Sequence, residues 1–394
     1  MALSERAQPR LVTARFAIVV ASGICYFLAL GTVIPAVPLY VKKELDGGSV
    51  AVGVAVGALF LGAVLLRPLA GRIGDRYGRR ILVIGGAATV AVSLFGYAFA
   101  DSLLPLVVAR FVTGLGEAAF FVGAATMITD LAPAERRGEA ISYWSVAIYS
   151  GFAFGPAIGE AVHDRWGYTT LWIVAGALGV GSAVLACFTR ETEAARASGP
   201  MGPLIHRRAL GPGAVLFLGL IATAAWGAFI PLYSEEVGIE DVGIVFVVFG
   251  GLVLLIRVLG ARLPDRWGGA RSGTVALVAS AIGMALMAAF ASAAGLMSGV
   301  VAFSVGSAFL YPAMLLLALD GSALTERGAV VGTVSSCFDL SQGIGSLLVG
   351  GVAALTSYRG AFATGAVTSV LAVVVLWQIV VPRRARFGVA QDAV

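Results

Sequence analysis

The chain has 394 residues, of which 59% are hydrophobic and only 12% charged, and its mean hydropathy is +0.94. A soluble domain carries about 25% charged residues, so this composition excludes an ordinary soluble protein and indicates an integral membrane protein without a large soluble domain. The net charge of +5 comes from Lys and Arg residues that gather in alternate loops, which favours membrane topology over nucleic-acid binding as its explanation.

Apolar runs of about 20–25 residues, the length that a tilted membrane-crossing helix requires, recur along the whole chain. The first run continues to about Val37 without a small-residue cleavage site, which favours an uncleaved span over a signal peptide. We predict about twelve spans, at residues 14–38, 49–70, 80–100, 104–129, 138–163, 168–189, 209–233, 241–263, 271–293, 294–319, 327–356 and 358–381.

A stretch of glycine and charge lies between the second and third predicted spans. Its main positions are Gly71, Asp75, Arg76, Gly78, Arg79 and Arg80. So few residues between two spans make those spans antiparallel, and connections rich in Lys and Arg face the cytoplasm. We therefore expect a short cytoplasmic loop here, which fixes the orientation of the other spans.

The distribution of basic residues supports this orientation. With a cytoplasmic amino terminus, about 20 of the 27 Lys and Arg residues fall in cytoplasmic segments and about 4 in external ones. The remaining three, Arg67, Arg110 and Arg257, lie within spans. We expect both termini in the cytoplasm, and the protein in a bacterial inner (plasma) membrane.

Several segments recur at one constant spacing along the chain. Asp75-Arg76-Tyr77-Gly78 recurs as Asp265-Arg266-Trp267-Gly268, and at the same spacing Arg67 corresponds to Arg257. A polar segment at 190–208 separates the two copies. We predict an amino-terminal bundle at 1–189, a cytoplasmic linker at 190–208 and a carboxy-terminal bundle at 209–394. Such a parallel repeat suits alternating access by rocking of one bundle against the other.

The pattern Gly71-x-x-x-Asp75-Arg76-x-Gly78-Arg79-Arg80 resembles the signature between the second and third spans of the major facilitator superfamily of secondary transporters. The resemblance covers essentially the whole chain. It implies an all-α membrane protein with twelve transmembrane helices in two six-helix bundles. In this family the Asp of the signature is associated with the start of the eleventh span, which implies a gate contact between Asp75 and the region of Arg327, with Asp265 as a weaker counterpart.

Two further patterns point to a subgroup. Arg110-x-x-Thr113-Gly114-x-Gly116 is similar to the family's fourth-span pattern, with Thr113 where Gln is usual. Gly151-x-x-x-Gly155-Pro156-x-x-Gly159 resembles the fifth-span pattern of proton-coupled antiporters, particularly twelve-span drug exporters, although Ser142 and Glu160 depart from it. Independently of the family, Gly151, Gly155 and Gly159 form one stripe for close helix packing, and Pro156 bends the helix. The stripe is interpreted either as a plain packing face or as a hinge that also seals against proton leak.

Ionisable residues inside spans are expensive in lipid and indicate a pathway. Glu117 lies near the middle of the fourth span, with Arg110 about two turns away on the same helical face. We predict that Glu117 exchanges protons under the influence of Arg110; the alternative is a permanently paired, structural Glu. Asp339, near the middle of the eleventh span, is the second candidate, with a structural polar contact as its alternative. Glu160 and Glu235, near the outer ends of spans, are expected in solvated rims.

Aromatic side chains near mid-span are candidates for substrate contact. The resemblance places Tyr26, Trp226 and Tyr311 on helices that line the central cavity. The alternative for each is packing in the core or against lipid.

The sequence lacks the patterns of the main competing classes. No HExxH, GxSxG or GxxxxGK[ST] motif is present, so neither an enzyme nor an ATP-driven pump is indicated. Cys25, Cys187 and Cys337 lie far apart in apolar runs, so no disulfide framework, metal site or cofactor is expected.

We predict a proton-coupled efflux antiporter for small apolar or amphipathic compounds that functions as a monomer, its partners being the substrate, protons and the lipid bilayer. The alternatives are an exporter of a sugar, siderophore or other metabolite, and a proton symporter.

Overall fold

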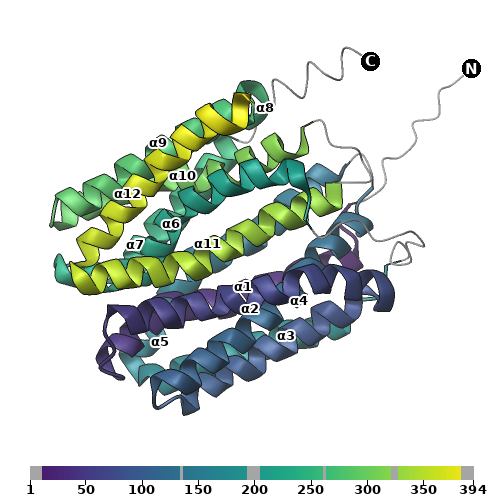
Figure 1. Cartoon of the computed structure of the whole chain (residues 1–394). Helices are drawn as coiled ribbons and strands as arrows, with labels where there is room; N and C mark the ends of the chain where they lie inside the picture. The colour runs from purple at the N-terminus through teal and green to yellow at the C-terminus, as the bar shows by residue number, and fades with distance from the viewer. Residues whose placement is uncertain (1–10, 134–135, 193–204, 261–262, 321–326, 383–394) are drawn as a thin grey trace, which may run out of the picture.

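The computed structural model describes residues 11–133, 136–192, 205–260, 263–320 and 327–382. These residues form helices joined by short connections and contain no strand. Eleven of the described helices are long and apolar enough to cross a membrane. They run side by side with their axes roughly parallel or antiparallel (Figure 1).

The helices follow the apolar runs of the sequence closely. In chain order they are α1 (Ala14–Lys43), α2 (Ser49–Tyr77), α3 (Arg79–Gly96), η1 (Tyr97–Phe99), α4 (Leu103–Leu131), α5 (Arg137–Cys187), α6 (Arg207–Glu236), α7 (Val242–Leu259), α8 (Leu263–Trp267), α9 (Gly269–Ala289), α10 (Ala293–Leu319), α11 (Arg327–Leu355), α12 (Tyr358–Val375) and η4 (Leu376–Val380).

The predicted fifth and sixth spans both lie in α5, which is why eleven helices stand where the sequence predicts twelve spans. Gly167 interrupts the helical backbone of α5 with φ 76° and ψ 179°, so two helical stretches meet there at a kink. The break falls between the predicted ranges 138–163 and 168–189. Only a residue without a Cβ adopts this left-handed φ readily.

The charged stretch between the second and third spans is not a loop. Residues 71–77 continue α2, because Gly71 and Gly74 permit the helix and Gly78 N still donates a hydrogen bond to Gly74 O at 3.0 Å. The chain turns at Gly78 alone, with φ 97°, and α3 begins at Arg79. Gly268 makes the same kind of turn in the second copy, with φ 77°. The predicted ten-residue loop is therefore corrected to a helix end and a one-residue turn.

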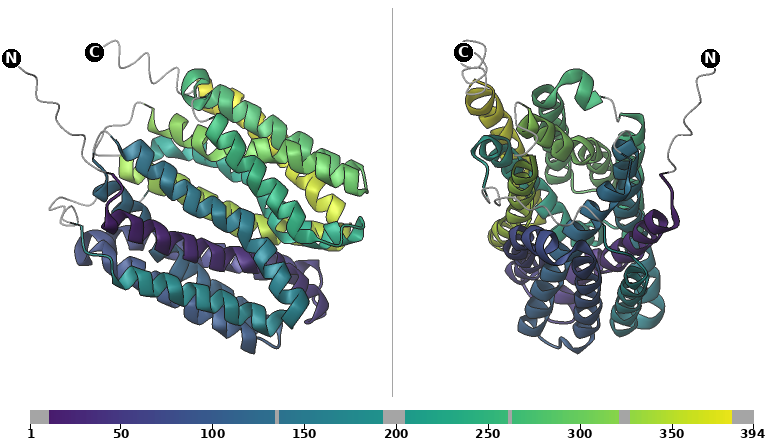
Figure 2. Two further views of the ribbon diagram at one scale, coloured as in Figure 1. Left: turned by 180° about the vertical axis from the view of Figure 1, so that it is seen from behind. Right: turned by 90° about the vertical axis from the view of Figure 1, so that its right-hand side faces the viewer.

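The helices form two groups, α1–α5 and α6–α12, which lie beside each other (Figures 1 and 2). The start of α1 and the end of η4 lie at one end of the molecule, together with the turn at Gly78; we call this the loop end and the opposite one the far end. The predicted linker at 190–208 falls largely outside the described residues, which stop at Thr192 and resume at Ile205.

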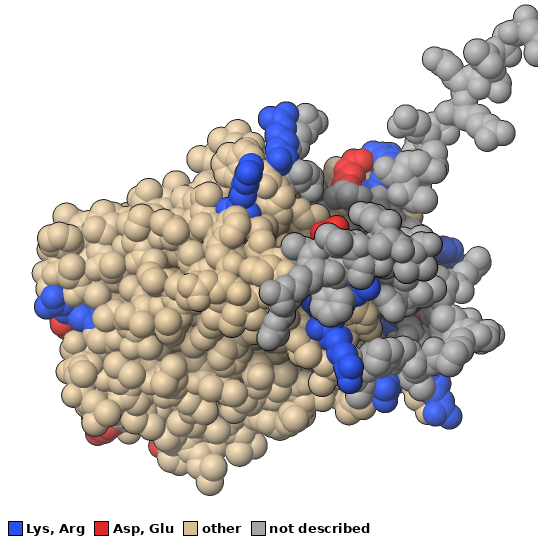
Figure 3. Space-filling view, turned by 45° about the horizontal axis from the view of Figure 1, so that its top comes forward, with Lys and Arg blue, Asp and Glu red and all other residues tan. Residues whose placement is uncertain are grey.

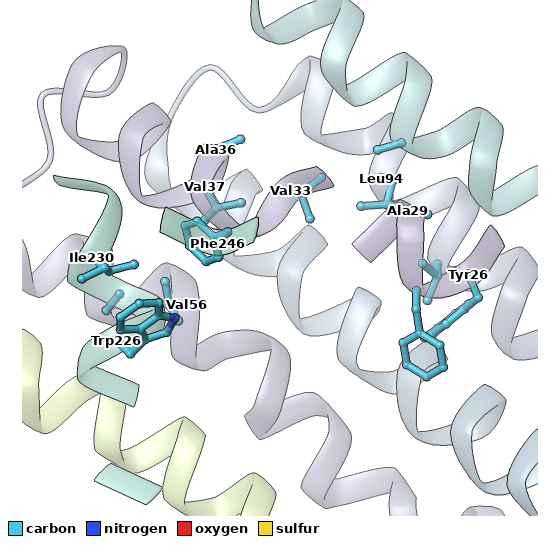
Figure 4. Close-up of a cluster of buried hydrophobic side chains, with 14 of the residues drawn as sticks. Tyr26, Ala29, Val33, Ala36, Val37, Val56, Leu94, Trp226, Ile230 and Phe246 are labelled. Carbon is cyan, nitrogen blue, oxygen red and sulfur yellow. The ribbon is translucent and has the colours of Figure 1, made fainter. Parts of the chain in front are cut away.

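The apolar core is shared between the two groups most extensively in the far half. One large buried cluster includes Val33 of α1 and Val56 of α2 together with Trp226 of α6 and Phe246 of α7 (Figure 4). In the loop half, the second group has a cluster of its own around Leu310. Between membrane-spanning helices, close van der Waals packing is a main source of attraction, so this shared cluster helps to hold the two groups together toward the far end.

Close backbone packing joins the groups in the same region. A Cβ added at Gly53 of α2 would lie 2.3 Å from Ser346 O of α11. Glu160 of α5, which the sequence places in a solvated rim, instead accepts a hydrogen bond from Val242 N at the start of α7, at 2.7 Å. Such a carboxylate satisfies backbone N–H groups that a helix start leaves unpaired.

The outermost contact between the groups is an ion pair. Lys43 Nζ at the end of α1 lies 2.6 Å from Glu235 Oε1 of α6, so Glu235 is paired across the groups. Both side chains are exposed, which limits this pair to roughly 0–1 kcal/mol. Together with the glycine contact and the Glu160 cap, it closes the far end.

Charged side chains are sparse along the sides of the molecule. On the face that Figure 3 shows, Lys and Arg gather mainly at the loop end, a few charges mark the far end, and the broad surface between them is almost free of charge. An uncharged belt with basic residues at one border is what a lipid bilayer requires of a spanning protein.

Candidate functional site

Arg67 of α2 joins two carboxylates that are far apart in the sequence. Its Nη2 donates a hydrogen bond to Glu117 Oε2 of α4 at 2.8 Å. The same guanidinium donates to Asp339 of α11, from Nε to Oδ2 and from Nη2 to Oδ1, the latter at 3.1 Å. Glu117 belongs to the same group of helices as Arg67 and Asp339 to the other, so this guanidinium connects the two groups.

The three charged side chains are largely removed from solvent. Exposure is 10% for Arg67, 14% for Glu117 and 2% for Asp339. An unpaired ion in such surroundings is strongly unfavourable, so each charge depends on the others. Two carboxylates and one guanidinium carry one net negative charge when all are ionised, and the uptake of one proton makes the cluster neutral. The cluster is therefore suited to bind and release a proton.

Close packing of α2 on α4 places Arg67 beside Glu117. A Cβ added at Gly114 would lie 1.7 Å from Leu59 O, and one at Gly62 would lie 2.2 Å from Phe111 O. Glycine at both positions lets the two backbones approach. The Glu117 side chain can then reach the guanidinium.

Polar contacts between α11 and α6 set the position of Asp339. Ser341 Oγ donates a hydrogen bond to Phe217 O at 2.6 Å, and Gln342 Nε2 donates to Leu220 O at 3.4 Å. These contacts fix the rotation of α11 on its neighbour, and Asp339 is turned toward α2.

The cation that meets Glu117 is Arg67 and not Arg110. The buried Arg110 donates from Nε to Ala55 O at 3.0 Å and from Nη2 to Val56 O at 3.3 Å. Two turns of α4, about 10 Å, separate Arg110 from Glu117, and its side chain extends to the carbonyls of α2 instead. The Arg110 side chain thus joins α4 to α2 within one group. Its predicted influence on proton exchange at Glu117 stays a prediction.

Two predicted cavity residues, Tyr26 and Tyr311, lie near the charged cluster. Tyr26 is fully buried, stacks on Phe120 with ring centroids 3.8 Å apart, and is within electrostatic reach of Arg67. Its hydroxyl has no hydrogen-bond partner among the described residues. The Tyr311 hydroxyl shares a hydrogen bond of 2.9 Å with Ser335 Oγ and is also within electrostatic reach of Arg67.

The third predicted cavity residue, Trp226, lies in an aromatic cluster of the second group. Its ring centroid is 4.6 Å from that of Phe249 and 5.4 Å from that of Phe303. Only 4% of the residue is exposed. In this conformation Trp226 is a core residue, and its contact with substrate stays a prediction.

The glycine stripe of α5 packs directly on α1. A Cβ at Gly151, Gly155 or Gly159 would lie 2.3, 2.5 or 2.2 Å, respectively, from atoms of Phe27, Gly31 and Thr32. These distances leave no room for a side chain, so the stripe is a packing face. Pro156 lies inside α5. The hinge role predicted for Pro156 and for the glycine stripe stays a prediction.

The charged turn at the loop end is held by the side chain of Glu191, which follows α5, and by that of Asp130 at the end of α4. Glu191 accepts hydrogen bonds from Arg79 N at 2.8 Å and Arg80 N at 3.1 Å, and so caps the start of α3. Asp130 at the end of α4 pairs with the Arg79 guanidinium and accepts a hydrogen bond from Thr192 Oγ1 at 2.9 Å.

The predicted gate contact falls outside the described side chains. Those of Asp75, Asp265 and Arg327 are not described, so the contact between the helix ends and α11 stays a prediction. The Arg76 guanidinium carbon lies 5.2 Å from the centroid of the Tyr77 ring, and Arg266 is exposed.

Comparison with known proteins identifies the fold and the family. The profile of the Major Facilitator Superfamily matches residues 19–322 and 213–393. The chain belongs to the major facilitator superfamily (MFS).

Two similar proteins come from bacteria. An uncharacterised MFS-type transporter of Salmonella typhimurium is 28% identical over 365 residues, covering 89% of this chain and 92% of the relative. One from Burkholderia pseudomallei is 28% identical over 383 residues, covering 93% and 91%.

Solved structures share the fold at low identity. The crystal structure of the nucleoside transporter NupG has a TM-score of 0.72 and 12% identity, and covers 93% of this chain and 98% of its own. That of the human organic anion transporter MFSD10 has a TM-score of 0.72 and 19% identity, and covers 94% and 100%. These structures show the shared fold. Membership of the superfamily and the eleven apolar helices make the protein an integral membrane transporter for a small molecule.

Proposed function

We propose that this MFS transporter is a proton-coupled antiporter that exports small amphipathic organic compounds. The observation that carries the proposal is the guanidinium of Arg67, which is shared between Glu117 of its own group of helices and Asp339 of the other. We assign Asp339 the proton-exchange step, because it is the member of the cluster that separates from Arg67 when the groups move apart at this depth.

The chemistry follows from the cost of an unpaired buried charge. If the groups part while Asp339 is ionised, its carboxylate loses the guanidinium and becomes a lone charge in a low-dielectric interior. Protonation removes this charge, and Arg67 keeps Glu117 as its counter-ion. Proton uptake therefore favours separation of the groups at mid-depth, and proton release favours their contact, which couples proton movement to the conformational change.

The contacts between the groups support an alternating-access cycle. The shared apolar core and the Lys43–Glu235 pair lie toward the far end. In the proposed orientation the loop end is cytoplasmic, both termini lie inside a bacterial inner membrane, and this conformation is closed to the outside. The helices of 1–189 and 209–394 act as the two rocking bundles, and the monomer is the transporting unit.

The proton step is tested in proteoliposomes that contain a pH-sensitive dye, with a panel of amphipathic organic anions, cations and neutral compounds applied in turn. We expect substrate-driven proton movement in the wild type, its loss in Asp339→Asn, and a strong reduction in Glu117→Gln. Glu139→Gln is the matched control, because Glu139 is an exposed acid that pairs only locally with Arg136. Proton movement at the wild-type rate in Asp339→Asn would contradict the proposal.

The same assay separates the alternatives. An antiporter moves protons opposite to its substrate, and a symporter moves them in the same direction, so the sign of the pH change distinguishes export from uptake. The fold similarity to the nucleoside transporter NupG supports metabolite transport as the second candidate, and the similarity to the organic anion transporter MFSD10 supports an amphipathic anion. A response to sugars or nucleosides and not to the amphipathic panel would favour the second candidate.

A further inference from the structure

The internal repeat places a second arginine where the first group has Arg67. Arg257 of α7 follows Arg67 at the spacing that also relates Asp265 to Asp75, so it holds the same position in the second copy. Its guanidinium carbon is 4.6 Å from the centroid of the Tyr149 ring of α5, so it too faces the other group of helices. The two arginines therefore occupy equivalent places on opposite sides of the boundary between the groups.

The partners of the two arginines differ in charge. At the spacing of the repeat, Tyr149 is the counterpart of Asp339, and Ser307 is the counterpart of Glu117. At both positions that correspond to the carboxylates around Arg67, the second copy has a neutral hydroxyl side chain. The Arg67 cluster holds two carboxylates against one guanidinium, whereas the positions equivalent to them give Arg257 no anionic partner.

The structure shows unused hydrogen-bonding capacity at this second site. Arg257 Nε is enclosed, yet no described residue accepts a hydrogen bond from it, and the enclosed Ser307 Oγ also has no partner among the described residues. A guanidinium in a spanning helix is stabilised by a paired anion, and it binds a carboxylate through two parallel hydrogen bonds. Hydroxyl groups can donate to the same oxygens.

Tyr311 connects the two sites. It lies one helical turn after Ser307 on the same face of α10, and its hydroxyl shares a hydrogen bond with Ser335 Oγ of α11, the helix that carries Asp339. Its ring and that of Tyr149 offer apolar surface beside the cation. The surroundings thus fit a ligand with one negative charge attached to an apolar or aromatic body.

We propose that Arg257, with Tyr149, Ser307 and Tyr311, binds the carboxylate of the transported substrate, which makes the substrate an amphipathic organic anion. This assignment rests on the proposed transport function and specifies its substrate class. Arg257 provides the counter-charge, and the two tyrosine rings contact the apolar body. The Arg67 cluster carries the proton, so substrate and proton occupy separate, pseudo-equivalent sites.

Binding is tested on the purified protein in detergent, where no proton gradient exists. Thermal unfolding is followed by tryptophan fluorescence while naphthalene-2-carboxylate or its neutral analogue, naphthalene-2-carboxamide, is titrated. A ligand that binds only the folded state stabilises it by RT ln(1 + L/Kd), where L is the free ligand concentration, so the dependence of the unfolding temperature on ligand concentration gives the affinity. We expect the carboxylate to bind the wild type at least tenfold more tightly than the amide. Arg257→Gln should remove this preference, and Arg257→Lys, which keeps the charge without the planar fork, should retain part of it.

Arg165→Gln is the matched control, because Arg165 also lies over an aromatic ring, that of Trp166, but at the surface of the far end. It should bind the carboxylate as the wild type does. If Arg257→Gln does not unfold cooperatively, Tyr149→Phe and Ser307→Ala decide: each removes one hydroxyl and should weaken carboxylate binding about 2- to 12-fold, the effect of one net hydrogen bond.

Three results would overturn the assignment. The first is a preference for carboxylate over amide that is unchanged in Arg257→Gln, or unchanged in both Tyr149→Phe and Ser307→Ala. The second is equal affinity of the wild type for the carboxylate and the amide. The third is that none of benzoate, naphthalene-2-carboxylate and anthracene-2-carboxylate stabilises the wild type. Failure of the proton mechanism has a different signature, since the carboxylate would then bind at Arg257 while its transport moves no protons. The two proposals can therefore fail independently.

Discussion

Removal of the shared guanidinium should destabilise the protein more than removal of either of its carboxylate partners. Arg67→Gln leaves both Glu117 and Asp339 without a cation, and loss of one partner from a buried ion pair costs about 3–5 kcal/mol. Asp339→Asn leaves Arg67 paired with Glu117, and the Asn oxygen can still accept a hydrogen bond. Its cost should be closer to that of one hydrogen bond to a charged group, about 1.5–3 kcal/mol.

The assay is equilibrium unfolding in mixed detergent micelles, followed by tryptophan fluorescence, for a double-mutant cycle of Arg67→Gln and Asp339→Asn. Because the double variant no longer buries the Asp339 carboxylate, it should be more stable than Arg67→Gln alone. Arg67→Lys keeps the charge but loses the planar fork, and should lie between the wild type and Arg67→Gln. Arg165→Gln, at an exposed position, should change the free energy of unfolding by less than about 1 kcal/mol.

Two outcomes would refute the reasoning. If Asp339→Asn lowers the free energy of unfolding as much as Arg67→Gln does, then the two carboxylates do not depend on the Arg67 guanidinium in the way proposed. If the double variant is no more stable than Arg67→Gln, the orphaned Asp339 carboxylate is not the source of the loss.

Two predictions concern the glycines. Gly155→Val should abolish the monodisperse peak in size-exclusion chromatography, because the added Cβ would lie 2.5 Å from Gly31 Cα. Gly181→Val is the control and should keep the peak, because the space around Gly181 is open. Equal behaviour of the two variants would contradict the packing role of Gly155. Gly78→Ala should lower the unfolding temperature more than Gly167→Ala. Both glycines combine a positive φ with an extended ψ, a conformation that costs another residue about 1–3 kcal/mol. Only at Gly78 would the added Cβ also collide with the carboxylate of Glu191, at 2.2 Å, so an equal loss in the two variants would show that the collision is relieved without cost.

Local chemistry was sufficient for much of the fold. The apolar runs placed the helices within a few residues of their ends, because a spanning helix must be apolar over the thickness of a bilayer. The repeat predicted equivalent turns, and Gly78 and Gly268 do share a left-handed conformation. The charged stretch after Ala70 was misread, because glycine and charge are typical of loops, whereas at the border of a membrane a helix can extend beyond the lipid.

The candidate site shows the limit of the sequence. Glu117 and Asp339 were recognisable from their depth in the spans, since an ionisable group there is expensive. Arg67 and Arg257 were visible as a repeated pair, but nothing in the sequence indicates which charged side chain meets which.

The sequence by itself determined the class of protein, the positions of the helices and the candidate acids, because these follow from hydropathy and spacing along one chain. Only the tertiary structure decided that Arg67 and not Arg110 is the partner of Glu117, that Asp339 joins them from the other group, and that Arg257 lies over the ring of Tyr149 of the first group. Those pairings depend on the rotation of each helix and on glycine contacts between helices distant in sequence, and a pattern along the chain does not encode them.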